Sequence, residues 1–255
     1  PLQTITFHEE KIGMNHSNCG DIFVVDVGFP SDIDELTGPG ELFLFPNFDS
    51  KKHKGQNGKV AIIGGGEYSG APALSALGAY RGGVDLVHVF VPEVSYGAVS
   101  SFAPELIVHK FAGNRVNQDV LGLIEKEQFD SIVVGPGMGK HKDCIKTVQG
   151  IIDNFENLVL DADAINIISN ENKLLSFIPE NSILTPHPKE FERLVGKWKS
   201  DINKLILLKN FSKKYKLICI LKGANTSICF PNGNIYFNSS GNPGMASAGS
   251  GDVLA

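Results

Sequence analysis

The sequence has few cysteines, and their spacing excludes the common cysteine-based sites. The four cysteines lie at positions 19, 144, 219 and 229, and no two of them form a Cys-x-x-Cys pair of the kind that holds zinc or exchanges disulfides. Cys219 and Cys229 fall in apolar, strand-like segments, where a free cysteine behaves as a small hydrophobic residue. We therefore expect reduced cysteines, no zinc and a cytoplasmic location.

The sequence also lacks a long apolar run, a signal peptide, internal repeats and an excess of basic residues. We therefore expect no membrane partner. The net charge of −5 argues against nucleic acid as the main partner, which would favour a basic face. One basic cluster, residues 51–54, is either a solvated loop or a contact for an anionic ligand. With 255 residues, 42% of them hydrophobic, the chain can bury one large core.

From about residue 58 onward, short apolar runs alternate with helix-like segments. The candidate strands are residues 60–63, 86–91, 106–110, 131–134, 158–160, 183–184, 217–221, 227–230 and 235–237. The candidate helices are residues 71–81, 118–126, 142–154, 164–168, 188–195 and 202–214. This alternation predicts an α/β fold with a mostly parallel sheet and helices on both faces. The turn at 231–234 predicts a late antiparallel hairpin.

Glycines and small polar residues follow five of the predicted strands. These segments are residues 64–70, 135–139, 161–163, 185–190 and 222–226. Ligands of open α/β sheets bind beyond the carboxyl ends of the strands, so the five segments should meet at one edge. After the first strand, Gly64, Gly66 and Gly70 have the spacing GxGxxxG, which departs from the dinucleotide fingerprint GxGxxG. They indicate either a tight strand-to-helix turn or a surface that a ligand approaches closely.

The strongest single signal is Gly249-Ser250-Gly251-Asp252 near the end of the chain. Glycines at the start of a helix let consecutive backbone amides point at a phosphate group, and the helix dipole favours the negative charge. A carboxylate repels phosphate, so Asp252 is best explained as a base that takes a proton from a hydroxyl during phosphoryl transfer. Alternatively, Asp252 only stabilises the first turn of the helix.

Three other strand ends carry possible ligand groups. Residues 222–226 read Lys-Gly-Ala-Asn-Thr, which is either a turn or a phosphate-binding segment. His187 lies between two prolines that stiffen it, so it is either structural or a ligand contact. Asp161 and Asp163 are candidate supports for Mg²⁺ or its waters, because Mg²⁺ binds one or two carboxylates and keeps several waters.

Taken together, these motifs resemble the NAD(P)H-hydrate dehydratase family of the ribokinase-like superfamily. The resemblance covers residues 51–255 and depends on segments that occur in the family order. These segments are residues 54–60, 68–72, 134–139, 160–164, 184–190, 221–224 and 249–254. It implies a ribokinase-like fold, phosphorylation of the hydrated nicotinamide ring from ADP or ATP with Mg²⁺, and release of phosphate. It also implies that the protein forms a homo-oligomer, for which a tetramer is the common form in the family.

Roles for individual residues follow from the resemblance. Asp252 is the implied catalytic base. The implied nucleotide-binding residues are Lys222, Gly223, Ala224, Asn225, Thr226, Gly249, Ser250 and Gly251. The implied contacts to the hydrated dinucleotide are Ala71, Pro72, Gly137, Gly139, His187 and Asp252.

Residues 1–30 resemble the last strands of the NAD(P)H-hydrate epimerase domain, which precedes the dehydratase in many microbial chains. We therefore expect a remnant of that domain at 1–30 without epimerase activity, a linker at 31–50 and a dehydratase domain at 51–255. Family members continue beyond the Gly-Ser-Gly-Asp helix, so we expect this domain to be truncated at its C-terminus.

Two other functions remain open at this point. A ribokinase-like kinase of a small alcohol or vitamin precursor would use the same Gly-Ser-Gly-Asp segment. A nucleotide-binding regulator or oxidoreductase with half a Rossmann fold would bind NAD without hydrolysing a nucleotide, but it leaves Asp252 unexplained. The Thr185–Pro188 segment and the epimerase-like leader favour the dehydratase.

Overall fold

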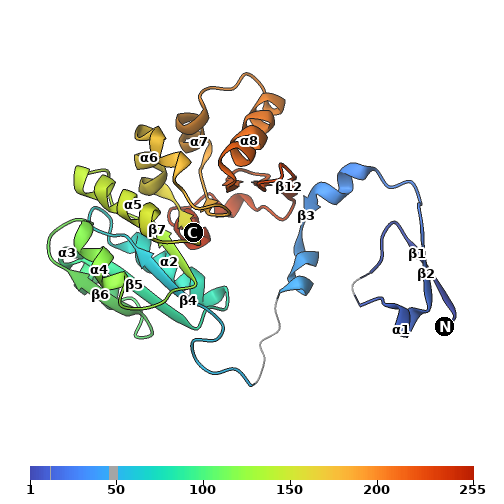
Figure 1. The fold of residues 1–255 in the computed structure, drawn as a ribbon, viewed down its shortest axis with the longest axis horizontal. Helices are drawn as coiled ribbons and strands as arrows, with labels where there is room; N and C mark the ends of the chain where they lie inside the picture. Colours follow the sequence, from blue (N-terminus) through green and yellow to red (C-terminus); the bar gives the residue numbers. More distant parts are fainter. Residues whose placement is uncertain (12, 46–50) are drawn as a thin grey trace.

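The computed structural model describes residues 1–11, 13–45 and 51–255, and its main body is built on a ten-stranded sheet (Figure 1). The strand order is β3-β12-β11-β10-β9-β8-β7-β4-β5-β6. The strands are β3 (Leu36–Thr37), β4 (Lys59–Ile63), β5 (Leu86–Pro92), β6 (Ile107–Phe111), β7 (Ser131–Val134), β8 (Leu158–Leu160), β9 (Ile183–Leu184), β10 (Ile218–Leu221), β11 (Ser227–Cys229) and β12 (Ile235–Asn238). Every neighbouring pair is parallel except the two that involve β11.

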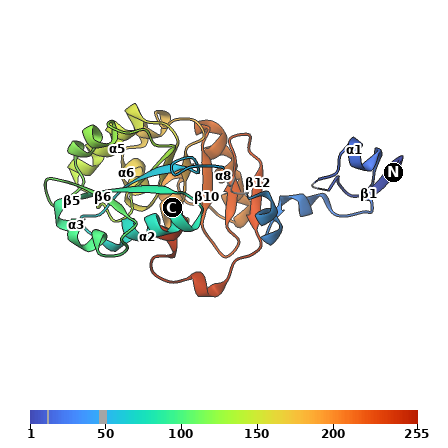
Figure 2. The ribbon, with the colours of Figure 1, turned by 90° about the horizontal axis from the view of Figure 1, so that it is seen from below.

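Helices cover both faces of this sheet (Figure 2). They are α2 (Gly70–Arg81), α3 (Glu93–Ser100), α4 (Leu121–Ile124), α5 (Lys142–Asn154), α6 (Ala162–Asn170), α7 (Pro188–Val195), α8 (Asp201–Tyr215) and α9 (Ser250–Leu254). Short 3₁₀ turns are η3 (Gln118–Val120), η4 (Asn172–Ser176) and η5 (Pro243–Met245). No helix in the described ranges is long and apolar enough to cross a membrane.

The side chains of β4 contribute alternately to two hydrophobic cores, one on each face of the sheet, because successive side chains of a strand point to opposite faces. Val60 and Ile62 join the core under α2 and α3, whereas Ala61 and Ile63 join the larger core under α4–α8. Both faces are therefore buried, which is why the central strands are mostly apolar.

The segment before residue 51 has a different organisation. β1 (Gln3–Phe7) and β2 (Asp21–Val25) form a separate parallel pair, with α1 (His16–Cys19) between them. This pair lies apart from the main body in both views (Figures 1 and 2). The 3₁₀ turns η1 (Ser31–Glu35) and η2 (Pro39–Leu44) flank β3, which pairs in parallel with β12 at the edge of the large sheet.

The predicted fold class is confirmed, including the antiparallel hairpin between β11 and β12. Helix α3 and strand β3 are not among the predicted elements. Helix α3 follows β5 with no side-chain cap and contains Gly97 and three serines or tyrosines, so it has weak helical signals. The two-residue strand β3 lies within the segment that was expected to be a linker. The helix expected at 118–126 is shorter, because it starts as the 3₁₀ turn η3 and ends at Ile124.

Candidate active site

A buried carboxylate at the end of β8 connects three strand ends. Asp161 is 2% exposed and its Oδ1 accepts hydrogen bonds from Thr185 Oγ1 at 2.7 Å and from Lys222 Nζ at 2.9 Å. Asp161 follows β8, Thr185 follows β9 and Lys222 follows β10. The backbone amide of Lys222 also donates to Pro186 O at 2.9 Å. The carboxyl edge of the sheet is therefore held together by side chains as well as by strand pairing.

Helix α9 brings the Gly-Ser-Gly-Asp segment to this same edge. A Cβ added at Gly251 would lie 3.5 Å from Lys222 Nζ, so the lysine points at the first turn of α9. Gly249, the N-cap, has a φ of +89°, the left-handed region that glycine adopts without strain. First-turn amides have no partner within the helix, so the amides of Gly251 and Asp252 are available at this end. The last turn packs on α2, where a Cβ at Gly78 would lie 2.5 Å from Val253 O.

The carboxyl group of Asp252 has a raised pKa. The main cause is partial burial, and the nearby charge of Asp161 raises the pKa further, whereas Lys222 lowers it. Both neighbours belong to the cluster just described, so α9 places Asp252 within electrostatic reach of the lysine and of the buried carboxylate. A carboxylate with a raised pKa holds a proton more readily, which suits a general base.

His187 is fixed by the start of α7. Its Nδ1 accepts hydrogen bonds from the amides of Lys189 and Glu190, at 3.1 and 3.2 Å, and Glu190 Oε2 accepts the amide of His187 at 2.9 Å. This capping box fixes the tautomer, because an Nδ1 that accepts hydrogen bonds leaves the proton of the neutral ring on Nε2. Burial lowers the pKa of His187, and the charges of Lys222 and Arg193 lower it further. His187 therefore has a neutral imidazole with the proton on Nε2, and this nitrogen lies 3.4 Å from Oε1 of the buried Glu190.

The glycine turns after β4 and β7 are joined to each other. Gly65 N donates to Pro136 O at 2.9 Å, and Tyr68 N donates to Gly137 O at 3.1 Å. A Cβ at Gly64 would lie 2.1 Å from Pro136 O, so only glycine permits this approach. The glycines after the first strand therefore form a tightly packed strand-to-helix turn at the carboxyl edge of the sheet.

Asp163 is placed differently from Asp161. Its Oδ2 accepts the amide of Gly139 at 2.9 Å, so it holds the turn after β7. Of the two residues expected at the start of α2, Ala71 is half-buried, whereas Pro72 is buried beneath the Gly64 turn.

The loop at 222–226 is exposed at residues 223–225. Its turn is closed by Thr226 Oγ1, which accepts the amide of Gly223 at 3.3 Å. A Cβ at Gly241 would lie 2.5 Å from Ala224 O, so the chain that leads into α9 runs against this loop. The two segments expected to bind the nucleotide are therefore neighbours in the fold.

Sequence reasoning did not assign Glu190 and Thr185 to the site. Glu190 is 4% exposed and holds His187, and burial raises its pKa, with the His187 amide and Lys222 opposing that shift. The signal for Glu190 was present, since a glutamate three residues after an N-cap indicates a capping box. Thr185 has no comparable signal, because its role depends on a carboxylate 24 residues away in sequence.

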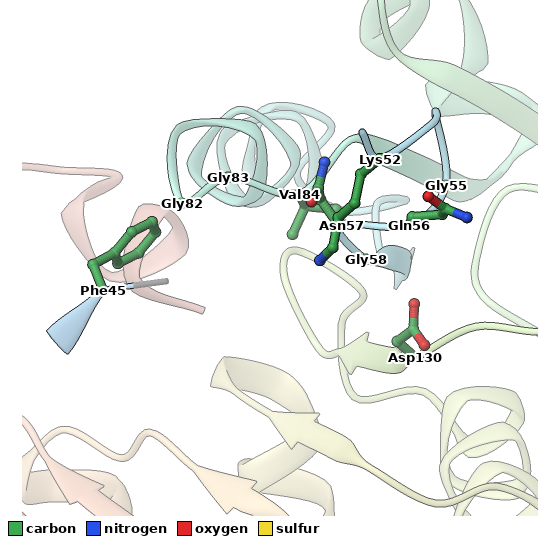
Figure 3. A pocket seen from close by; sticks show the side chains of 10 residues that line it. All are labelled: Phe45, Lys52, Gly55, Gln56, Asn57, Gly58, Gly82, Gly83, Val84 and Asp130. Atoms are coloured by element: carbon green, nitrogen blue, oxygen red, sulfur yellow. The ribbon is translucent and has the colours of Figure 1, made fainter. Parts of the chain in front are cut away.

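A cavity of about 370 Å³ lies at the carboxyl edge beside Gly139, lined also by Gly66, Glu67 and Arg115. A different cavity of about 360 Å³ lies at the amino ends of β4, β5 and β7, where Figure 3 shows Lys52, Asn57 and Asp130 around it. The basic cluster at 51–54 thus adjoins the edge opposite the site.

Two groups of side chains outside the site have ligand atoms close enough to share a metal ion. They are His88, His109 and Glu127, and His8, Glu9 and Asp34. Glu127 is paired with Lys59 and His8 with Asp34. Neither group adjoins the carboxyl edge around Asp161.

Comparisons with known proteins agree on one family. Residues 60–255 match the Carb_kinase family model, described as NAD(P)H-hydrate dehydratase. The chain is 36% identical over 259 positions to a bifunctional NAD(P)H-hydrate repair enzyme from Archaeoglobus fulgidus, covering 99% of this chain and 52% of that protein. It is 32% identical over 223 positions to an ATP-dependent (S)-NAD(P)H-hydrate dehydratase from Drosophila melanogaster, covering 83% of this chain and 71% of that protein. The chain spans about half the length of the bifunctional relatives it matches.

Solved structures agree on the fold. A ribokinase-like superfamily protein from Enterococcus faecalis aligns with a TM-score of 0.74 at 28% identity, covering 86% of this chain and 77% of that one. An ADP/ATP-dependent NAD(P)H-hydrate dehydratase from Bacillus subtilis, co-crystallised with ATP and Mg²⁺, aligns with a TM-score of 0.66 at 25% identity, covering 82% of this chain and 73% of that one.

Proposed function

Because the chain belongs to the NAD(P)H-hydrate dehydratase family, we propose that it converts hydrated NADH and NADPH back to NADH and NADPH, with ADP or ATP as phosphoryl donor. The observation that supports this most directly is the meeting of Lys222, Asp161 and the first turn of α9 at one strand edge. This arrangement offers a cation, free backbone amides and a carboxylate base within a single site.

The chemical difficulty is the leaving group. Hydration places a hydroxyl on a ring carbon, and hydroxide leaves poorly. Transfer of the terminal phosphoryl group to that hydroxyl oxygen turns it into a phosphate ester. The carbon–oxygen bond then breaks, phosphate leaves with the bonding electrons, the ring nitrogen supplies electron density, and the neighbouring ring carbon loses a proton. The net result is loss of water from the ring, with the phosphoryl donor shortened by one phosphate.

Asp252 is the proposed base for the first step. Its raised pKa allows it to accept the hydroxyl proton as the oxygen attacks phosphorus, a role worth on the order of 10²–10⁴-fold in rate. Lys222 and the amides of Gly251 and Asp252 would stabilise the charge on the transferring group. Residues 223–226, with Gly249 and Ser250, would hold the remainder of the nucleotide.

On the substrate side, His187 would donate its Nε2–H to the carboxamide or a ribose oxygen of the hydrated dinucleotide. Gly139 and Ala71, at the start of α2, would form the surface against which the ring lies, with the buried Gly137 and Pro72 directly behind it. The joined turns after β4 and β7 make this surface mostly backbone, which suits the close approach of a flat ring.

The carboxylates at the edge fit a magnesium ion, since Mg²⁺ prefers oxygen ligands and needs only one or two carboxylates beside phosphate oxygens. Both proposed ligands already have protein partners, because Asp161 Oδ1 accepts from Lys222 and Thr185 and Asp163 Oδ2 accepts the Gly139 amide, so both would support the ion through its waters. When bound, the ion would neutralise phosphate charge. We also propose a cytoplasmic homo-oligomer, with a tetramer as the expected form.

The test is a turnover assay on the purified protein. Hydrated NADH or NADPH is incubated with Mg²⁺ and either ADP or ATP, and recovery of reduced-nicotinamide absorbance is followed. We expect recovery only when a nucleotide is present, with one nucleotide consumed per dinucleotide restored. Nucleotide consumption with accumulation of a stable phosphorylated product would instead assign the protein as a kinase.

A further inference from the structure

Two positively charged side chains, without a carboxylate partner in the part of the chain that the structure describes, line the cavity beside Gly139. Arg115 and Lys140 both line it. Within the described residues, neither has a carboxylate within 4.0 Å of its charged nitrogens. Arg115 is half-buried, whereas Lys140 is exposed. A half-buried guanidinium without a counter-charge carries a desolvation cost, which an anionic ligand would offset.

Backbone packing fixes the position of Arg115. The loop after the edge strand β6 reaches back over the turn after β4, where a Cβ at Gly66 would lie 3.3 Å from Arg115 Cα. Asn117 Nδ2 donates to Arg115 O at 3.4 Å and to Ala112 O at 2.9 Å. Arg115 Nε donates to Asn114 Oδ1 at 3.0 Å, which leaves its two terminal nitrogens free to bind an anion.

The sheet order determines which ligand reaches this cavity. The proposed nucleotide segments follow β10 or belong to α9, whereas the cavity lies over β4 and β7, with the loop after β6 at its side. With the phosphoryl donor on the β10 side, the remainder of the substrate dinucleotide must extend from the reacting ring towards β4 and β6. Gly139 belongs both to the proposed ring surface and to this cavity, so the two are continuous.

The substrate dinucleotides carry phosphate groups at two positions. Both hydrated dinucleotides carry a bridging diphosphate, and only hydrated NADPH carries a 2′-phosphate. Arginine matches phosphate with two parallel hydrogen bonds, and lysine adds a point charge. The carboxylate of the exposed Glu67 lies against Gly139, where a Cβ would be 3.0 Å from Glu67 Oε2, and it repels phosphate but accepts hydrogen bonds from ribose hydroxyls.

We propose that Arg115 and Lys140 bind a phosphate group of the substrate dinucleotide and thereby determine its affinity and the choice between the NADH and NADPH forms. This inference rests on the proposed function, because it takes the hydrated dinucleotide as the substrate.

The test compares Arg115→Met and Lys140→Met with Lys142→Met, a matched loss of one exposed positive charge that does not line the cavity. We expect Arg115→Met to raise KM at least about tenfold with kcat nearly unchanged, in the range of a lost hydrogen bond to a charged group. An increase for both hydrated dinucleotides identifies the diphosphate as the ligand, and an increase for hydrated NADPH alone identifies the 2′-phosphate. The KM of Arg115→Lys should lie between the KM of the wild type and that of Arg115→Met. Unchanged KM for both substrates in Arg115→Met overturns the proposal.

Binding of NAD⁺ and NADP⁺, measured by calorimetry without turnover, separates this inference from the proposed function. A wild type that binds either dinucleotide but does not repair hydrates, with binding lost in Arg115→Met, would refute the function and support the phosphate site. A wild type with turnover, together with an Arg115→Met variant of unchanged KM and Kd, would refute the site alone. Equal thermal unfolding midpoints would show that all variants are folded.

Discussion

Lys222 Nζ lies 2.9 Å from Oδ1 of Asp161, and this pair connects the strand end that would hold the nucleotide with the buried centre of the sheet edge. Asp161 is 2% exposed and Lys222 is 21% exposed at the side chain. The lysine therefore neutralises a buried carboxylate and also points at the first turn of α9. Its loss should affect stability and catalysis together.

We expect Lys222→Met to lower the free energy of unfolding by about 3 kcal/mol, because it leaves a buried carboxylate unpaired. Lys216→Met is the matched control, since its partner Glu180 and Lys216 itself are both about 60% exposed. Exposed pairs contribute about 0–1 kcal/mol. Urea denaturation of both variants measures the difference. Equal effects in the two variants would show that the Lys222–Asp161 pair is not a buried interaction.

Asp252→Asn should reduce turnover by at least about 100-fold while nucleotide binding is retained, because an amide cannot accept the hydroxyl proton. Calorimetric titration with ATP and a single-turnover assay provide the two measurements. The raised pKa of Asp252 also predicts that the wild-type rate falls as Asp252 becomes protonated, and that this fall begins at a higher pH than for an aspartate of ordinary pKa. Turnover close to the wild type in Asp252→Asn would remove Asp252 from the role of base.

Two substitutions at His187 separate its capping role from its proposed ligand role. Asparagine is a good N-cap, so His187→Asn should keep the stability of α7 while the Nε2–H donor is lost. His187→Ala loses both and should cost a further 1 kcal/mol or so in unfolding free energy. We expect KM for the hydrated dinucleotide to rise in both variants. A normal KM in His187→Asn would mean that the ring only caps the helix.

Glycine at position 135 is required by close backbone packing. Its φ is +125°, and a Cβ there would lie 1.9 Å from Asp161 O. Gly135→Ala should therefore destabilise the protein by more than about 2 kcal/mol and displace Asp161. Gly122→Ala in α4, where a Cβ meets open space, should be neutral or stabilise by up to about 1 kcal/mol. Thermal unfolding of both variants tests this contrast.

His88 and His109 should make the fold less stable in mild acid. Burial lowers the pKa of each ring below the ordinary 6.5, against the opposing effect of Glu127. The unfolded chain takes up protons as the pH falls below about 6.5, whereas the folded chain does not, so stability decreases from there towards the lowered pKa values.

The double variant His88→Gln/His109→Gln should lose this part of the pH dependence. Its unfolding free energy, measured from pH 7.5 down to about pH 5, should decline less steeply than that of the wild type. Parallel pH profiles would exclude the two histidines as the cause.

Much of the fold could be predicted from the sequence because buried parallel strands have a distinctive pattern. The run Val60–Ile63 is apolar on both faces and ends in glycines, so both its type and its end were clear. The same pattern predicts that Lys222, His187 and Asp252 lie at one edge of the sheet. Helix α3 lacked such signals, because its residues are small or polar and nothing caps it.

The contacts between distant segments could not be predicted. The position of Arg115 depends on a loop that crosses over the turn of another strand, and nothing in the sequence near residue 115 indicates this crossing. The position of Asp161 after a strand suggests a metal ligand, but its hydrogen-bond partners Thr185 and Lys222 are 24 and 61 residues away in the sequence. Such pairs are determined by the sheet order, which short-range patterns do not contain.

The short strand β3 protects an edge of the large sheet. It pairs with β12 through Leu36 and Thr37, and Thr37 O accepts both the amide of Ser239, at 2.8 Å, and its hydroxyl, at 2.7 Å. Unpaired strand edges recruit strands from other chains, which leads to aggregation. Two residues near the start of the chain thus occupy the β12 edge, at the end of the sheet farthest from β6, where a strand of another chain would otherwise pair.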